Sequence, residues 1–564
     1  MTASAHRFVL LTDLHLSDNP DTAAHQALQW AVDRVNVERP DFLAVAGDVT
    51  TFSTGVSAER CLQALDRVEV PVLFTPGNAE RRAGHAMSVF ETLAAPDRRV
   101  AAFGDLRVLL PDTSTGTLPS DERSWLVRSL GSSRGERRLV ITHYPLDRMD
   151  GESRTWLTRW LCENRVELLV AGHSHFHRTR RENGVVEAVV RGLDPDKAIG
   201  DLPGISLFES GQKGAWTEAF IPWSPAIRLL PADLPNDMQP VGWSIQGDPV
   251  TAARETLGSG LHCLEIRPAD LDFSRQALSA ALGDVRDQGP LYLSFHLPDL
   301  RWNSGAGRVD GVDAVRAHLD CAMEAGADSL TVHVPRATAR EMERVREHRP
   351  EATGCFLAFA RTFGSLFRQA VREGVGIAIE NIHNPDNTPV DSPDREFATR
   401  IDEYLRWIDA VATEMADLPG ARVGALLDVG HARNNGGDLD NLQPLGDWYA
   451  RLGRRIMGYH IHQVETDPGS GLLSNHHEIT DLFGSRISFA GFLWAWSTHQ
   501  ITRGPLFVEV RDAEGRVKTV RRFQRLFENA RRIREAVDLS GMDRMNLEET
   551  SCTTRLKLSG FFQI

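Results

Sequence analysis

The stretch Phe8-Val9-Leu10-Leu11-Thr12-Asp13-Leu14-His15 places an Asp-x-His motif at the end of an apolar run. The run predicts a buried strand, and its exit loop carries a carboxylate and an imidazole on one side. A short Asp-x-His can arise by chance, so its weight depends on the residues at the ends of the later strands. Four further motifs lie directly after short apolar runs: Ala46-Gly47-Asp48, Pro76-Gly77-Asn78, Thr142-His143-Tyr144 and Gly172-His173-Ser174-His175. Together these oxygen and imidazole groups suit two divalent ions.

Strand-like and helical segments alternate through the first part of the chain, from residue 7 to about residue 195. The expected strands are 8–11, 42–46, 72–75, 108–110, 139–142, 167–171 and 185–190. The helical pattern is clearest in 23–37 and 57–66. This order predicts a layered α/β domain over residues 1–215, with its ligands at the strand exits, where such folds place their sites.

With its five motifs in this order, the first part resembles the calcineurin-like metallophosphoesterases, in particular the branch of cyclic-nucleotide and glycerophosphodiester phosphodiesterases. The segment from Leu110-Pro111-Asp112 to Ser124-Trp125-Leu126 is also similar to that branch. The resemblance implies two divalent ions (Mn, Fe or Zn) and attack by a metal-bridging hydroxide. It implies one ion on Asp13, His15 and His175, the other on Asn78, His143 and His173, and Asp48 between them. Asp48, Asn78 and His143 are the expected catalytic residues.

One motif departs from the family pattern. Where the family usually has Gly-Asn-His, this chain has Gly77-Asn78-Ala79-Glu80. Alanine neither donates a proton nor hydrogen-bonds a phosphate oxygen. Three alternatives are open: the leaving group needs no acid, Arg81 or His85 substitutes as a substrate-binding group, or this domain is slow or has become a binding module.

The second part of the chain has a different repeat. Prolines are frequent before residue 240, so residues 216–240 are expected to form a linker. Beyond them lie eight strand-like runs with helical stretches between them: 241–245, 261–266, 291–296, 329–334, 375–380, 422–428, 456–462 and 505–510. This pattern predicts a (β/α)8 TIM barrel over residues 241–535.

Histidines and carboxylates again lie at the ends of these strands. They are His296, His333, Glu380, Asp428, His431, His460, His462, His476, His477 and Glu509. In a TIM barrel the C-terminal strand ends converge on one mouth. Burying so many ionisable groups there has little structural purpose unless a metal compensates the cost.

This part resembles the xylose-isomerase-like barrels that include endonuclease IV and the sugar-phosphate isomerases and epimerases. The metal core shared by that superfamily maps to Glu380, Asp428, His460 and Glu509, with Glu380 and Glu509 also as catalytic groups. The likeness to endonuclease IV adds further metal ligands, namely His296, His333, His431 and His477, or His476 in the other register. The resemblance implies two or three Zn or Mn ions, with His462 and His476 left to bind substrate. In both registers around Asn475-His476-His477 the aspartate ligand of endonuclease IV is missing.

Bulk properties restrict the partners. The formal net charge is -14, which disfavours broad nucleic-acid binding and favours a small phosphorylated sugar or nucleotide. Six scattered cysteines without a Cys-x-x-Cys pair indicate reduced thiols. With neither a targeting segment nor a membrane-spanning run, we expect a cytoplasmic protein. The tail, 536–564, is expected to wrap a neighbouring surface or to mediate self-association into a homo-oligomer.

These residues support three functional hypotheses. The leading one is a bifunctional metal-dependent hydrolase, whose first domain cleaves a phosphodiester or cyclic phosphate and whose barrel acts on a related phosphorylated compound. For the barrel, the histidine count favours phosphoester hydrolysis, whereas the acidic charge favours a sugar-phosphate isomerase or epimerase. The third hypothesis, prompted by Ala79 and the missing aspartate, is a non-enzymatic metal-bound scaffold or regulatory module.

Overall fold

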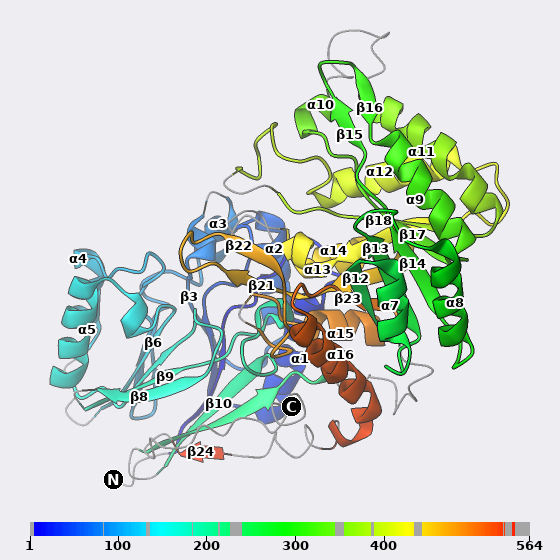
Figure 1. Ribbon diagram of the computed structural model, residues 1–564. Coiled ribbons are helices and arrows are strands. Elements are labelled where there is room, and N and C mark those ends of the chain that lie inside the picture. The colour runs from blue at the N-terminus through cyan, green and yellow to red at the C-terminus, as the bar shows by residue number, and fades with distance from the viewer. Residues whose placement is uncertain are drawn as a thin grey trace. The chain divides into compact units, whose positions relative to one another are not determined.

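The computed structural model describes residues 5–82, 84–130, 136–182, 184–211, 215–225, 240–343, 355–384, 388–433, 443–484, 486–533, 535 and 544–546. The chain divides into two compact units (Figure 1). The first unit contains Met1–Leu229, Asp481–Trp494 and Arg532–Gly560, and the second contains Leu230–Thr480, Ala495–Arg531 and Phe561–Ile564. Each unit has its own sheet system and its own group of ionisable side chains.

The first unit contains two six-stranded sheets. The first sheet has the order β24-β11-β10-β1-β2-β3, with β1 (Arg7–Leu11), β2 (Phe42–Ala46), β3 (Val72–Thr75), β10 (Gly204–Ser210), β11 (Trp216–Pro222) and β24 (Arg544–Asn546). The second has the order β4-β5-β6-β7-β9-β8, with β4 (Val100–Phe103), β5 (Leu106–Leu109), β6 (Arg137–Thr142), β7 (Leu168–Ala171), β8 (Arg178–Glu182) and β9 (Val185–Val189). Helices connect these strands: α1 (Ala23–Glu38), α2 (Gly55–Leu65), α3 (Ala86–Phe90), α4 (Ser120–Ser129) and α5 (Gly151–Glu163), with the short 3-10 turns η1 (Ala79–Arg81), η2 (Leu146–Arg148) and η3 (Pro195–Lys197).

Apolar side chains from both sheets form the core of this unit. The ring of Phe8 stacks on Phe42 and on Phe208, with centroids 5.1 and 4.7 Å apart, and residues of β5, β6, β7 and β9 pack in the same cluster. Helices α4 and α5 cover the other face of the second sheet (Figure 1), where Trp125 and Trp160 are buried. Strands β1, β2 and β3 are parallel, and so are β6 and β7. The loops that leave these parallel strands therefore reach the same edge, which positions the first site.

The second unit is a closed barrel of eight parallel strands, which confirms the predicted TIM barrel. In barrel order the strands are β12 (Val241–Gly247), β13 (Cys263–Pro268), β14 (Tyr292–His296), β17 (Ser329–His333), β18 (Gly376–Glu380), β19 (Val423–Asp428), β20 (Ile456–Ile461) and β23 (Leu506–Val508). The helices of this unit are α7 (Pro249–Thr256), α8 (Arg275–Arg286), α9 (Val312–Glu324), α10 (Ala339–Glu343), α11 (Cys355–Arg372), α12 (Ile401–Glu414), α13 (Val429–Arg433), α14 (Leu445–Leu452) and α16 (Ala513–Glu528), with the turn η6 (Gly453–Arg455). Helix α15 (Ala490–Ser497) contains the boundary at which the chain passes from the first unit to the second. Two hairpins interrupt the repeat, β15 (Arg301–Asn303) with β16 (Arg308–Asp310), and β21 (Gln463–Thr466) with β22 (Leu473–His477).

The unit boundaries differ from those expected from the sequence. The first seven residues of the expected linker, 216–240, form β11, whose inward-facing residues alternate with partly exposed ones along an antiparallel pairing with β10. The prolines around this strand hide that alternation in the sequence, while 226–239 lie outside the described residues. The segment Asp481–Trp494, expected within the barrel, belongs to the first unit. Of the expected tail, Arg544–Asn546 forms β24 beside β11.

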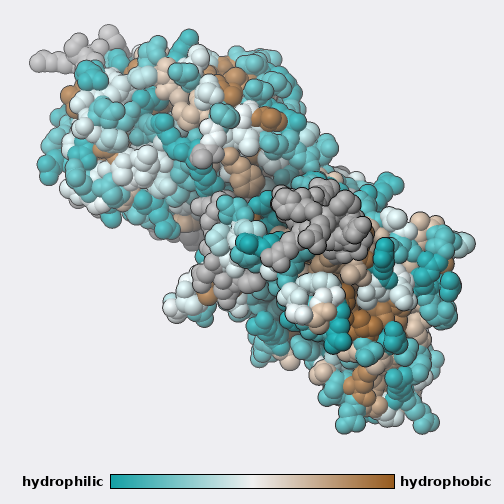
Figure 2. Space-filling view, turned by 90° about the horizontal axis from the view of Figure 1, so that it is seen from above, coloured by the Kyte–Doolittle hydropathy of each residue, from teal (hydrophilic) through white to brown (hydrophobic). Residues whose placement is uncertain are grey.

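Within the described ranges, no helix is long and apolar enough to cross a membrane. Figure 2 shows a face on which hydrophilic residues predominate and hydrophobic residues form small patches. Among the described residues, the large hydrophobic side chains that are exposed are Val37, Val56, Val127, Leu257 and Leu357.

Candidate metal centres

Strained backbone marks the first site. Among its residues, Asp13, His15 and Asp48 have φ angles of 53°, 45° and 52°, and His173 and His175 have 67° and 59°. Such left-handed angles are uncommon for residues other than glycine and persist only where the surrounding structure enforces them. Here the backbone N–H of Asp13 donates to Gly47 O (3.0 Å) and that of His15 to Asp48 O (3.0 Å). The two strand exits thus hold each other in the conformation that turns both side chains inward.

The first ligand group brings Asp13, His15 and His175 together, as the sequence predicts. His15 Nε2 lies 3.3 Å from His175 Nε2, and Asp13 Oδ1 lies 4.0 Å from the former and 3.6 Å from the latter. All three side chains are mostly or fully buried. One ion between these atoms would have two imidazoles and one carboxylate as ligands.

The second group contains Asp48, His143 and His173. His143 Nε2 lies 3.4 Å from Asp48 Oδ1 and 3.2 Å from His173 Nδ1. It also lies 3.1 Å from the amide oxygen of Asn78. The other carboxylate oxygen of Asp48, Oδ2, lies 3.8 Å from His15 Nε2 in the first group. Asp48 therefore stands between the two groups, as expected of a bridging ligand.

The chemistry of these groups fits divalent cations. Burial raises the pKa of Asp13 well above its ordinary value, and the nearby Asp48 raises it further. Burial also raises the pKa of Asp48. Asp13 Oδ1 is buried and accepts no hydrogen bond from the described residues. A divalent cation bound between the carboxylates and the imidazoles would offset the cost of burying the two carboxylates, and it would provide a partner for this oxygen.

Other groups orient the predicted ligands. His143 Nδ1 lies 2.8 Å from the carbonyl oxygen of Ala46, which leaves its Nε2 toward the site. The glycines of the motifs permit close approach, because a Cβ at Gly172 would lie 2.0 Å from Thr12 Oγ1 and one at Gly77 would lie 2.3 Å from Asp48 Oδ1. Any side chain at Gly172 or Gly77 would therefore collide with the neighbouring residues of the site.

Arg81 and His85 were expected to replace the histidine that is absent at Ala79, but neither has a contact that identifies it as a substrate-binding residue. Arg81 pairs with Asp112 and donates to Ser114 Oγ at 3.1 Å. The backbone N–H of His85 donates to Ser53 O at 2.8 Å. Substrate binding by Arg81 or His85 stays a prediction.

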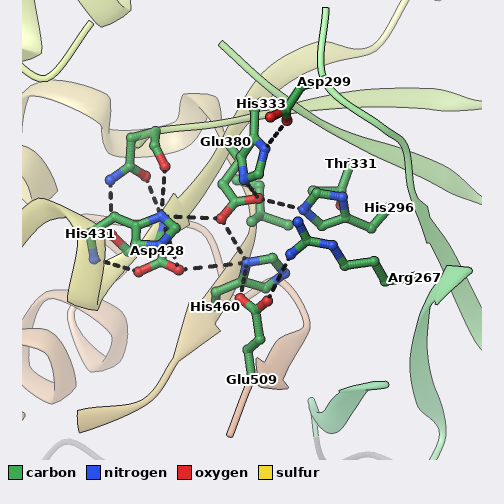
Figure 3. A network of polar contacts seen from close by, with 12 residues as sticks. Arg267, His296, Asp299, Thr331, His333, Glu380, Asp428, His431, His460 and Glu509 are labelled. Atoms are coloured by element: carbon green, nitrogen blue, oxygen red, sulfur yellow. Dashed lines mark hydrogen bonds and ion pairs between the residues drawn. The ribbon is translucent and has the colours of Figure 1, made fainter. Parts of the chain in front are cut away.

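In the barrel, Glu380 lies at the centre of the ligands (Figure 3). Its Oε2 lies 2.8 Å from His296 Nε2 and 3.1 Å from His333 Nε2. Its Oε1 lies 3.1 Å from His460 Nδ1 and 3.3 Å from His431 Nδ1. Because β14, β17 and β18 end at His296, His333 and Glu380, these side chains meet at one mouth of the barrel.

A second barrel group joins Glu380 with Asp428, His460 and Glu509. His460 Nδ1 lies 3.0 Å from Glu509 Oε2 and 3.7 Å from Asp428 Oδ2. Burial opposes ionisation of Glu380, but His333 and His460 outweigh it and hold the pKa of this carboxyl well below its ordinary value. Glu380 is thus a carboxylate shared by the two groups.

A third group contains Asp428, His431, His462 and His476. His462 Nε2 lies 3.0 Å from Asp428 Oδ1, and the backbone N–H of His476 donates to His462 Nδ1 at 3.0 Å. The sequence interpretation placed His462 with the substrate and left the aspartate position empty. In the structure His462 occupies this cluster, and a third ion would have three imidazoles and one carboxylate.

His477, the ligand expected in one register, lies outside these three groups. Its Nδ1 lies 3.5 Å from Glu465 Oε2, across the hairpin from β21 to β22. Neighbouring residues of a strand point to opposite faces, so only one of the two histidines can face the mouth. His476 does, with its Nε2 3.5 Å from Glu509 Oε2. We therefore transfer the ligand assignment to His476.

Two carboxylates that the sequence interpretation missed hold the histidines from behind. Glu265, fully buried on β13, lies 2.6 Å from His460 Nε2 and accepts hydrogen bonds from Ser244, Ser294 and Thr331. Asp299 lies 2.6 Å from His333 Nδ1, the nitrogen opposite the one facing Glu380. Such partners fix the ring orientation of metal-binding histidines. The only sequence signal was an isolated Glu265 inside the apolar run of β13.

The folds and ligand groups define a two-domain protein with a layered phosphoesterase-type domain and a metal-ligand-rich TIM barrel. Residues 254–538, just over half of the chain, match the xylose isomerase-like TIM barrel family, and the chain belongs to that family. Residues 6–177 match the calcineurin-like phosphoesterase family, which confirms a domain of this type fused to the barrel. A search of curated proteins finds no match.

Solved structures similar to each half are distant in sequence. A purple acid phosphatase from yellow lupin (Lupinus luteus) matches with 14% identity and a TM-score of 0.33, covering 39% of this chain and 52% of the lupin chain. The chain thus spans about half the length of that phosphatase. A D-tagatose 3-epimerase-like protein matches with 15% identity and a TM-score of 0.36, covering 52% of this chain and 98% of the other. A xylose isomerase-like TIM barrel protein from Mycobacterium smegmatis, in complex with magnesium, matches with 15% identity and a TM-score of 0.33, covering 50% and 88%.

Proposed function

We propose that the first domain is a dinuclear phosphodiesterase that hydrolyses a phosphodiester or cyclic phosphate. The observation that carries the proposal is the position of Asp48 between two imidazole-rich groups, 3.8 Å from His15 Nε2 and 3.4 Å from His143 Nε2. Two divalent ions (Mn, Fe or Zn) would supply Lewis-acid stabilisation of the phosphoryl oxygens and a nucleophile at neutral pH. The chain itself contributes buried, rigidly held metal-binding side chains, of which Asn78 and His143 would also face the substrate.

For the barrel we propose hydrolysis of a phosphoester on a related phosphorylated sugar or nucleotide, with two or three Zn or Mn ions. Both oxygens of Glu380 face imidazoles, Oε2 at 2.8 and 3.1 Å and Oε1 at 3.1 and 3.3 Å. A carboxylate engaged on both oxygens is suited to bridge ions and poorly suited to carry a substrate proton. The six histidines of the three groups also favour zinc-assisted hydrolysis.

The second candidate for the barrel is a sugar-phosphate isomerase or epimerase. It draws support from the family to which the barrel belongs and from the acidic net charge of -14, which suits a small substrate. In that reaction Glu380 and Glu509 would transfer protons on either side of a carbonyl carbon. An abasic-site oligonucleotide and a panel of ketose phosphates, assayed side by side, distinguish these two activities.

Turnover of bis(p-nitrophenyl) phosphate by the purified chain with Mn or Zn tests the central proposal. We expect Asp48→Asn to abolish hydrolysis and Asp428→Asn, its counterpart in the barrel, to leave it unchanged. The reverse result would move the diesterase chemistry to the barrel. If no divalent ion supports turnover of diesters or monoesters, the protein is a metal-bound scaffold rather than an enzyme.

Metal analysis of the protein purified without added ions complements the kinetics. Four or five ions per chain would fill both domains, whereas two would leave one domain without metal. Asp48→Asn and Asp428→Asn should each lower the content of one domain only.

A further inference from the structure

At Ala79 the first site has no side-chain hydrogen-bond donor, although the family usually has a histidine there that can contact the phosphate. Ala79 is fully buried, and its backbone N–H donates to Asp48 Oδ1 at 2.7 Å. The loop therefore still holds the bridging carboxylate, but its side chain offers no hydrogen-bond donor. A phosphodiester in this site would need a donor from another part of the domain.

The segment after β9 lies directly against the first ligand strand. The backbone N–H groups of Leu193 and Asp194 donate to Thr12 O and Asp13 O, both at 3.0 Å. A Cβ at Gly192 would lie 2.8 Å from the Cβ of Asp13 and 3.1 Å from His175 Nδ1. This close approach brings the following turn, η3, to the edge of the metal-ligand groups.

Turn η3 is rigidly held. The side chain of Asp194 accepts from the backbone N–H of Asp196, and Lys197 N–H donates to Asp194 O at 3.2 Å. On its other side, Pro195 O accepts from Ser488 Oγ at 2.6 Å within the same unit. Residues 194–196 and 198 are buried, while Lys197 is partly exposed. Lys197 is therefore the member of this turn whose side chain is partly open to solvent.

The positive charge of Lys197 acts on three residues of the site. Burial and Asp48 raise the pKa of Asp13, and Lys197 opposes that rise. Burial raises the pKa of Asp48, and Lys197 opposes this rise too. After burial, Lys197 is the strongest influence that lowers the pKa of His15. The charge of Lys197 therefore acts on residues of both ligand groups, in agreement with the hydrogen bonds that join the preceding residues to the exit of β1.

Residue choice points the same way. The chain has only four lysines among its 63 basic residues, and one of them occupies this position. A lysine offers a compact charge with three donors, whereas arginine offers a broad planar fork. Beside ligand groups that already contain four imidazoles, the compact ammonium suits a single phosphoryl oxygen.

Resting on the proposed phosphodiesterase function, we propose that the ammonium of Lys197 binds a phosphoryl oxygen of the substrate and supplies the donor that Ala79 lacks. No covalent step is involved: the lysine stays protonated and donates a charge-assisted hydrogen bond. It is a phosphoryl-binding residue, and the same contact would hold the phosphate product.

The test compares Lys197→Met, which keeps the length and removes the charge, with Lys197→Arg, which keeps the charge. Lys518→Met is the matched control, because Lys518 pairs with Glu514 on α16. Each variant is assayed with manganese on bis(p-nitrophenyl) phosphate and on the diphenyl ester, which has a poorer leaving group. Binding of inorganic phosphate is measured separately by calorimetry.

We expect Lys197→Met to lower kcat/KM and phosphate affinity by about tenfold or more, the usual effect of losing a charged hydrogen bond. The loss should be equal for both esters, Lys197→Arg should lose no more than about threefold, and Lys518→Met should match wild type. Unchanged phosphate binding in Lys197→Met, or a loss confined to the diphenyl ester, would overturn the proposal. If wild type binds phosphate through Lys197 but turns over no ester, the inference stands and the phosphodiesterase proposal fails.

Discussion

Glu80 provides a quantitative test of how the first site is held. Its buried carboxylate joins two strand exits: Oε2 accepts from the backbone N–H groups of Asp48 (2.8 Å) and Gly77 (2.9 Å), and Oε1 accepts from those of Val49 (2.9 Å) and Thr50 (3.1 Å). Burial and the nearby Asp48 raise the pKa of Glu80. Donors at both oxygens nevertheless require the ionised form, because a protonated oxygen would face an N–H group.

The substitution Glu80→Gln replaces one of these oxygens by an NH2 group. Either the pair Asp48 and Gly77 or the pair Val49 and Thr50 then faces a donor instead of an acceptor. Each buried N–H without a partner costs about 1–3 kcal/mol, so the expected loss is about 4 kcal/mol. That is a large part of the roughly 5–15 kcal/mol by which domains are usually stable.

Urea unfolding in the presence of a chelator measures this loss without a contribution from bound metal. Hydrogen exchange detected on peptides of each unit separates the two unfolding transitions. With a slope of about 2 kcal/mol per molar urea, the midpoint of the first unit should fall by about 2 M, and that of the barrel should not move. The control Glu59→Gln, on the exposed face of α2, should change neither. A loss under about 1 kcal/mol in Glu80→Gln would mean that Glu80 is protonated in the folded protein, and the reasoning would be wrong.

Three further predictions concern the barrel and the thiols. Glu265→Gln should lower zinc affinity of the barrel by about 10–100-fold, because the orientation of the histidine that it holds is lost, and a chelator competition followed by metal analysis checks this. His476→Ala should remove one ion from the barrel whereas the adjacent His477→Ala should remove none, so equal metal contents in the two variants would contradict the assignment of His476. Burial raises the pKa of Cys263 to about 12, whereas Cys162 is partly exposed, so iodoacetamide at pH 8 should label Cys162 before Cys263, as peptide mass spectrometry would show.

Strand periodicity and the residues at strand ends were enough to predict both folds and most residues of the candidate sites. Apolar runs such as 8–11 and 375–380 identify buried strands. The first polar residue after such a run marks the point where the strand leaves the core. In parallel sheets these ends meet at one edge, so a one-dimensional list of Asp13, Asp48 and His143 already predicts a cluster. The same reasoning predicts Glu380 and its neighbours at the mouth of the barrel.

Pairing between distant segments was not accessible in this way. Glu265 and His460 are separated by 195 positions, and nothing in either strand alone indicates that their side chains are hydrogen-bonded. Lys197 acquires its place only because the segment before it hydrogen-bonds to the exit of β1.

The sequence by itself determined the two fold classes and the residue types available for metal binding, because both depend on local periodicity and on where each strand ends. Tertiary structure alone decided that His476 rather than its neighbour enters the third barrel group, and that His462 joins the same group. The physical reason is register: a shift of one residue in a hairpin turns a side chain to the opposite face, and the energies that choose between registers come from contacts with the rest of the fold.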